Sequence, residues 1–151
     1  MHTASLTLRI DSRLDDVFLV GLSIRGICGV LPFDAAAIDA VEICVVEAVN
    51  NAIEHAYGNA PGHAVEVAVS VQHGALHVAV RDQGRAMDWP ATCAHADVRP
   101  IDPLADGGRG VFIIRSLMDD VSYAHRDGWN VLAMVKYAQP PVGAVELRRA
   151  T

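Results

Sequence analysis

The amino-acid sequence predicts an α+β fold, a two-layer α/β sandwich in which a mostly antiparallel mixed sheet carries helices on one face. Two observations lead to this prediction. Segments with apolar residues at every second position are joined by short turns typical of hairpins, which favours antiparallel pairing. Two segments with helical periodicity stand between the first strand and the next, and a third stands between later strands. The repeated strand–helix crossovers of a doubly wound dinucleotide fold are missing from this order.

The first strand is expected over residues 5–10, where alternating apolar residues are typical of an edge strand. Ser12 and Asp15 resemble a capping box, which predicts that a helix follows them and ends near Gly29. The apolar residues expected on the inner face of this helix are Leu14, Val17, Phe18 and Leu22.

A second, longer helix is expected to begin after Asp34, a good N-cap residue, and to stop at Gly58. Apolar residues recur every three or four positions along it, as a buried helix face requires. These residues are Ile38, Val41, Val45, Val49 and Ile53.

The other strands follow in two pairs, each joined by a turn. They are expected at residues 65–71 and 76–80, joined at His73-Gly74, then from residue 121 and over 129–137, joined at Arg126-Asp127-Gly128. Residues 82–106 show no sustained period and predict a long functional or mobile loop, followed by a short helix over 110–118. We therefore expect one domain over residues 1–138 and a C-terminal tail over 139–151.

Composition excludes several classes of protein. The 151 residues are 52% hydrophobic and 20% charged, which is ample for a packed core. A net charge of −6 without any basic run argues against nucleic acid or an anionic membrane as the main partner. A secretory signal pattern is not visible, which favours a cytoplasmic protein. The scattered histidines and three cysteines lack the spacing of a metal or redox site.

The second helix also carries a row of polar residues on one face, at offsets of zero, three, four and seven. The row consists of Glu47, Asn50, Asn51 and Glu54. A solvated helix face explains such a row in most proteins. However, two successive asparagines are poor helix formers, and no lysine or arginine answers the acids at four-residue spacing. These two features favour a functional row.

Two further motifs stand beside loops. Asp82-Gln83-Gly84 follows the end of a buried strand. It could form an ordinary β-turn, which Asp and Gly favour without any function. Alternatively, its carboxylate could bind a ligand amine while the glycine makes room for a flat ring. Gly107-Gly108-Arg109-Gly110 precedes an apolar helix. This segment could be a flexible hinge or a phosphate-binding site at the helix N-terminus. It lacks the Lys-Ser or Lys-Thr of a P-loop.

The order and spacing of these motifs resemble the Bergerat ATP-binding fold of the GHKL superfamily, and within it the bacterial anti-sigma factor serine kinases. Residues 47–53 resemble the N box of that family, residues 82–84 its G1 box and residues 108–110 its G2 box. The resemblance covers roughly residues 5–137. Ala86 stands where the superfamily often has a second glycine, and the last turn reads Gly128-Trp129-Asn130, where relatives often have Gly-Thr.

The resemblance implies a role for each motif. Glu47 is implied as general base, Asn51 as the Mg²⁺ ligand and Asp82 as the acceptor for the adenine amino group. Residues 85–106 are implied as an ATP lid. The implied nucleotide-binding residues are Asn50, Asn51, Asp82, Gly84, Gly108, Arg109, Gly110 and Val111.

The family further implies a homodimeric protein serine kinase with ATP and Mg²⁺ as cofactors. Its implied substrate is a STAS-domain anti-anti-sigma protein, and a sigma factor is a second implied partner. Two alternatives stay open. A histidine kinase catalytic domain would need a phosphoacceptor histidine on a preceding helix pair, which the sequence lacks. A non-catalytic nucleotide- or partner-binding module of the same fold would retain the site without transferring phosphate.

Overall fold

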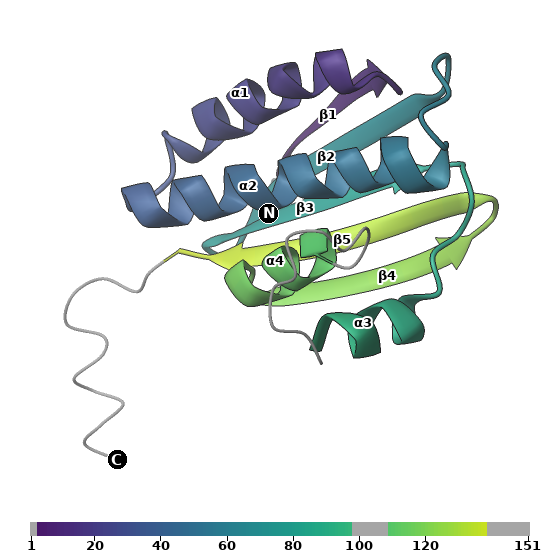
Figure 1. Ribbon diagram of the computed structural model, residues 1–151. Helices are drawn as coiled ribbons and strands as arrows, with labels where there is room; N and C mark the ends of the chain where they lie inside the picture. The colour runs from purple at the N-terminus through teal and green to yellow at the C-terminus, as the bar shows by residue number, and fades with distance from the viewer. Residues whose placement is uncertain (1–2, 98–108, 139–151) are drawn as a thin grey trace.

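The computed structural model describes residues 3–97 and 109–138, which form a five-stranded sheet with helices on one face (Figure 1). The strand order is β1-β2-β3-β5-β4. The strands are β1 (Ala4–Asp11), β2 (Ala64–Gln72), β3 (Ala75–Asp82), β4 (Asp120–Arg126) and β5 (Trp129–Tyr137). The α+β sandwich is confirmed. All four pairings are antiparallel, so the mixed character expected from the sequence is not found in the described sheet.

Three helices cover the inner face of the sheet: α1 (Val17–Cys28), α2 (Ala35–Asn51) and α4 (Arg109–Leu117). Helix α2 lies centrally, with α1 on one side and α4 on the other (Figure 1). Its residues Val41, Val45 and Val49 have no exposed surface and pack against the inner residues of the strands. Burial of these apolar side chains is the main force that holds the two layers together.

Helix α2 begins and ends as the sequence predicts. The Asp34 carboxylate accepts a hydrogen bond from the Ala37 amide at 2.7 Å, which satisfies one orphan donor of the first turn and stabilises the helix by about 1 kcal/mol. Beyond Asn51 the helix continues as the π-helical turn η2 (Ala52–Ala56). Gly58 then adopts a positive φ of 59°, the conformation that ends many helices. The polar row of α2 therefore runs into an irregular turn.

The expectations for the first helix were partly wrong. Ser12 does not cap it, because its buried hydroxyl donates to the Ala60 carbonyl at 2.6 Å and accepts from the His63 amide at 3.1 Å. The short turn η1 (Leu14–Asp16) precedes α1 instead. Of the four residues expected inside, Val17 is buried, whereas Leu14, Phe18 and Leu22 are 46%, 61% and 63% exposed. The buried face consists of Val17, Val20, Gly21, Ile24 and Cys28.

The segment expected to be a long loop contains a helix, α3 (Trp89–Asp97). Asp88 caps it by accepting a hydrogen bond from the Ala91 amide at 3.1 Å. Pro90 fits because amides of the first turn lack partners within the helix. The aromatic rings of Trp89 and Tyr123 stack with centroids 5.7 Å apart, which fixes the start of α3 against β4. Within the described residues, no helix is long and apolar enough to cross a membrane.

Candidate functional site

A cavity of about 420 Å³ lies where the end of α2 and η2 meets the end of β3 and the start of α4. That volume is typical of small-molecule sites. Its floor is apolar and includes Val80 and Leu132 from neighbouring strands. Its polar lining consists of Asn51, His55, Asp82, Arg85, Asp88, Thr92 and Tyr123. An apolar cleft with a few placed polar groups can hold a flat, hydrogen-bonding ligand.

Asp82 is held at the end of β3 with only 8% of its surface exposed. Its Oδ1 accepts hydrogen bonds from Asn130 Nδ2 at 2.7 Å and from the Gly84 amide at 2.9 Å. Oδ2 has no hydrogen-bond partner among the described residues. Every fully buried side-chain polar atom of these residues does have a partner, so Oδ2 is not fully buried and is accessible. Burial raises the pKa of the Asp82 carboxyl above its ordinary value, against the lowering effect of these two hydrogen bonds.

Asn130 is a site residue whose role the sequence reasoning missed. Its side chain is 1% exposed and donates to both Asp82 Oδ1 and the Gly84 carbonyl, the latter at 3.1 Å. Its own oxygen lies 2.6 Å from His125 Nδ1, which therefore acts as the donor. A signal was present, because the alternation of β5 places Asn130 on the same buried face as Leu132. A polar residue on a buried strand face needs partners and so marks a network.

The loop after Asp82 is fixed by backbone hydrogen bonds to two tyrosines and to η2. The Gln83 amide donates to the Tyr57 hydroxyl at 2.7 Å, and the Met87 amide donates to the Tyr123 hydroxyl at 2.8 Å. The Arg85 amide donates to the Ala56 carbonyl at 2.9 Å. These bonds hold one wall of the cavity in a single conformation.

Gly84 is required by this close approach. A Cβ atom at Gly84 would overlap the carbonyl group of Ala56. The Asp82-Gln83-Gly84 motif predicts a glycine that makes room for a ligand ring, but the structure gives a different reason, since η2 fills the space beside Gly84. Ala86, the departure from the two-glycine pattern, lines the cavity and is exposed. Whether Gly84 also touches a ligand stays a prediction.

The polar row of α2 meets the N-terminus of α4 at Gly110. A Cβ atom there would lie 2.9 Å from Glu47 Oε2 and 3.1 Å from Asn51 Nδ2, so only glycine lets the two elements approach this closely. Glu47 and Asn51 are half-buried, unlike the residues of a solvated helix face. The unpaired amides of a helix N-terminus and its positive dipole favour an anion at this point.

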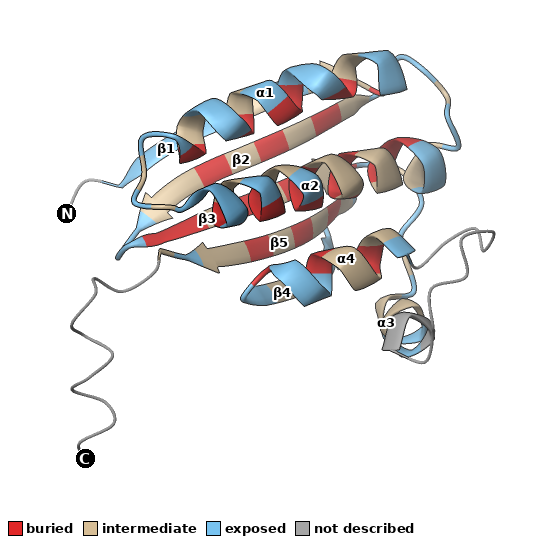
Figure 2. Ribbon diagram, turned by 60° about the vertical axis from the view of Figure 1, so that its left-hand side comes forward, coloured by how far each residue is buried: buried red, intermediate tan, exposed pale blue. Residues whose placement is uncertain are grey.

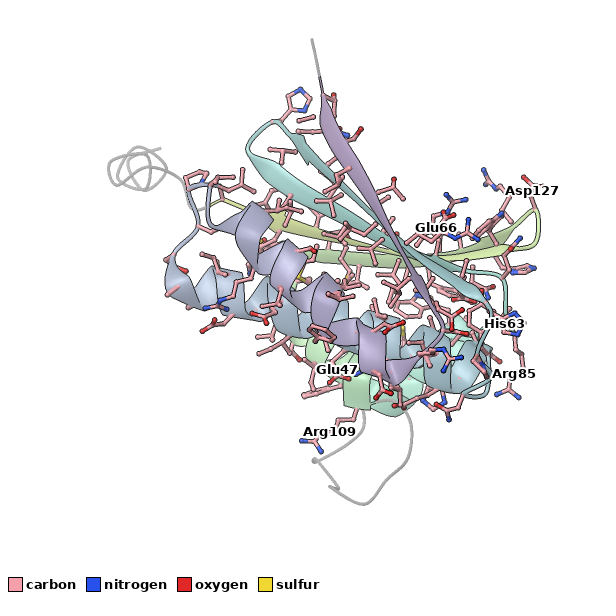
Figure 3. All side chains as sticks on the ribbon, turned by 90° about the horizontal axis from the view of Figure 1, so that it is seen from above. Glu47, His63, Glu66, Arg85, Arg109 and Asp127 are labelled. Carbon is pink, nitrogen blue, oxygen red and sulfur yellow. The ribbon has the colours of Figure 1, made fainter. Side chains whose placement is uncertain are left out.

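The structure brings some of the predicted residues to the cavity and leaves others outside it. Asn51, Asp82 and Val111 line it, and Gly110 and Glu47 meet beside it. Asn50 is half-buried but does not line it, and exposed Arg109 points away from the body of the protein (Figure 3). Gly108 and residues 98–106 of the expected lid lie outside the described residues.

Comparison with known proteins assigns this architecture to a class. Residues 10–136 match the histidine kinase-like ATPase domain, which implies ATP binding. The chain is 30% identical over 137 residues to the serine-protein kinase RsbW of Staphylococcus epidermidis, covering 87% of this chain and 86% of that protein. It is 31% identical over 142 residues to RsbW of Bacillus pumilus, covering 87% and 85%. The chain therefore belongs to the histidine kinase-like ATPase domain family, in the group of the RsbW serine-protein kinases.

A solved structure supports the fold. The RsbU and RsbW domains of Rv1364c from Mycobacterium tuberculosis align with a TM-score of 0.64 over 89% of this chain. The alignment spans 32% of that longer chain, at 18% sequence identity. The domain match over residues 10–136 and the two RsbW relatives confirm the family resemblance predicted from the sequence motifs.

Proposed function

We propose that this protein is an ATP- and Mg²⁺-dependent serine kinase that phosphorylates a STAS-domain anti-anti-sigma protein. In this proposal the protein acts as a homodimer and also binds a sigma factor. ATP binding follows from the family, and the kinase activity is supported by the similarity to RsbW serine-protein kinases. The identity of the partners rests on the resemblance of the sequence motifs to the anti-sigma factor kinases.

The observation that carries the proposal is the meeting of Glu47, Asn51 and Gly110 beside a cavity that Asp82 also lines. In the proposal, Asp82 Oδ2 accepts a hydrogen bond from the adenine amino group. The start of α4 then receives the phosphates, because its free amides favour anions. These groups come from packed elements that hold them in fixed positions, and phosphoryl transfer depends mainly on such positioning of the reacting groups.

Glu47 is proposed as the general base. Within the described residues, its carboxylate makes no hydrogen bond or ion pair, which leaves it able to accept a proton. The serine hydroxyl gives its proton to Glu47 as its oxygen forms a bond to the γ-phosphorus. The bond from that phosphorus to the bridging oxygen breaks, and ADP leaves with the electron pair.

The residues beside the cavity fit a Mg²⁺ ion held mainly by nucleotide. The described residues contain no group of three His, Cys, Asp or Glu side chains that could hold a metal alone. Mg²⁺ prefers oxygen ligands and commonly takes most of them from water and phosphate. The Asn51 side-chain oxygen is the ligand we propose, and the ion supplies neutralisation of phosphate charge.

The test incubates the protein with labelled ATP, Mg²⁺ and a candidate STAS-domain protein from the same organism. We expect label on a serine of that protein. Glu47→Ala should bind ATP within about twofold of the unchanged protein and slow transfer by roughly 10²–10⁴-fold. Glu54→Ala is the matched control, because Glu54 is an exposed acid two turns further along the same row.

Each outcome decides between the alternatives. Unchanged transfer by Glu47→Ala would remove Glu47 from the role of base. ATP binding without transfer to any of several candidate STAS proteins would replace the kinase with a non-catalytic nucleotide-binding module.

A further inference from the structure

Helix α1 exposes an apolar stripe that the fold does not use. Phe18 and Leu22 are 61% and 63% exposed and lie one helical turn apart. The opposite side of the same helix is buried, with Val20 and Ile24 packed in the core. Figure 2 shows this division, with the exposed residues of α1 turned away from the sheet. A helix that is apolar on both sides is normally covered on both sides, so this stripe indicates an interface.

Gly26 continues the stripe one turn beyond Leu22 and is also exposed. A Cβ atom added there would meet nothing within 4 Å, and its φ is not positive. The fold itself therefore gives no reason for glycine, although glycine within a helix costs about 1 kcal/mol relative to alanine. A close neighbour from outside the chain would give that reason.

We propose that a second copy of this chain covers the stripe, with the two α1 helices antiparallel about a twofold axis at Leu22. Phe18 stands four residues before Leu22 and Gly26 stands four residues after it. An antiparallel pair centred on Leu22 therefore places each Phe18 ring over the bare backbone at the other copy's Gly26. Such self-complementarity is the requirement for an interface between identical subunits.

The charges around the stripe permit this contact. Arg25, the cation beside it, is held toward α2 by ion pairs with Asp39 at 2.7 Å and Glu42 at 2.6 Å. Its guanidinium is thus neutralised within one copy and does not repel the other. The Phe18, Leu22 and Gly26 positions themselves carry no charge. Apolar surface can then be buried without an unpaired ion.

The pairing leaves the nucleotide cavity open, because α1 lies on the side of α2 away from α4 (Figure 1). The inference rests on the homodimer of the proposed function and is independent of the phosphotransfer chemistry. It adds to the proposed function the surface through which the two copies associate.

Sedimentation velocity of the full chain over a range of concentrations tests the surface. Leu22→Glu sets two carboxylates against each other at the axis, and we expect it to sediment as a monomer where the unchanged protein is a dimer. Ile43→Glu is the control, since Ile43 is a 45% exposed apolar residue on the neighbouring helix α2. It should dimerise like the unchanged protein, and ATP binding by each variant reports that it is folded.

A size exchange tests the orientation. Gly26→Leu should weaken dimerisation by at least about tenfold, because the added side chain takes the place of the partner's Phe18 ring. Phe18→Ala should weaken it through lost apolar contact. The double variant should dimerise more tightly than Gly26→Leu alone, because the introduced leucine side chain would then face an alanine in place of the phenylalanine ring.

The outcomes separate the claims. A dimer that tolerates both Leu22→Glu and Gly26→Leu would overturn the surface and keep the homodimer. A double variant no tighter than Gly26→Leu would overturn the antiparallel pairing. A monomer at every concentration would overturn both the surface and the homodimer, while the ATP and transfer assays would still judge the kinase.

Discussion

Replacing Asn130 tests how the cavity recognises its ligand. Asn130→Ala removes two donated hydrogen bonds, one to the buried Asp82 carboxylate at 2.7 Å and one to the Gly84 carbonyl at 3.1 Å. A bond to a charged group contributes about 1.5–3 kcal/mol and a neutral one about 0.5–1.5 kcal/mol. The free energy of unfolding should therefore fall by roughly 2–4 kcal/mol. For a domain of this size the melting temperature should drop by about 4–16 °C.

ATP affinity should fall with it, for a separate reason. Asp82 Oδ1 would keep only the Gly84 amide, so the carboxylate loses the partner that sets its orientation. We expect ATP binding, measured by calorimetry, to weaken by about ten- to a hundredfold. Asn130→Leu, which keeps the volume and removes the amide, should behave similarly. His125→Ala is the control, because it leaves the Asn130–Asp82 bond in place and should change affinity by less than about threefold.

One result would contradict this role of Asn130. If Asn130→Ala melts early but binds ATP as tightly as the unchanged protein, then Asn130 stabilises the fold without orienting Asp82. In that case the Gly84 amide alone would position the carboxylate.

Two further substitutions and one pH titration test other residues in and beside the cavity. Gly84→Ala should shift the loop and weaken ATP binding at least about tenfold, since its Cβ would overlap Ala56; wild-type affinity would contradict the close approach. Gly110→Ala should reduce both ATP affinity and the rate of phosphate transfer, because its Cβ would clash with the side chains of Glu47 and Asn51. If neither the affinity nor the rate changes, the close approach of Gly110 to these side chains has no role in the site. ATP affinity should be full above the raised pKa of Asp82 and fall as pH drops through it, beginning above the ordinary 3.8, while Asp82→Asn should bind weakly with no such step.

The sequence predicted the elements whose apolar pattern has one clear period. The strands and α2 alternate or recur regularly, so their positions were correct. The residues expected on their inner faces are buried or partly buried in most cases, but Leu6 of β1 is 48% exposed. Helix α1 is apolar almost all round, so periodicity marked its existence without marking its buried side, and Phe18 was placed inside wrongly. Helix α3 was missed because residues 82–106 show no sustained period and contain Pro90, a residue that interrupts most helices. Pro90 follows Asp88 and occupies the first turn of α3, where proline is tolerated.

The site residues that could be predicted from the sequence are polar residues at positions where an ordinary strand or helix has no need of them. Asp82 and Asn51 stand out because a carboxylate after a buried strand and an amide within a helix need explanation, and both line the cavity. Asn130 was harder, since its partners come from β3 and β4 and only the sheet register brings them together. Contacts across several strands depend on the pairing, which a local pattern does not specify.

Three glycines show what the structure adds to a sequence motif. Gly84 and Gly110 stand in motifs, and in each case a Cβ would meet the protein's own atoms, so the fold itself demands glycine. Gly26 stands in no motif, and a Cβ there would meet nothing. The first two glycines are explained by η2 and by the polar row of α2. The third is left with open space beside two exposed apolar side chains, and a glycine that its own chain does not require is best explained by a neighbour that does.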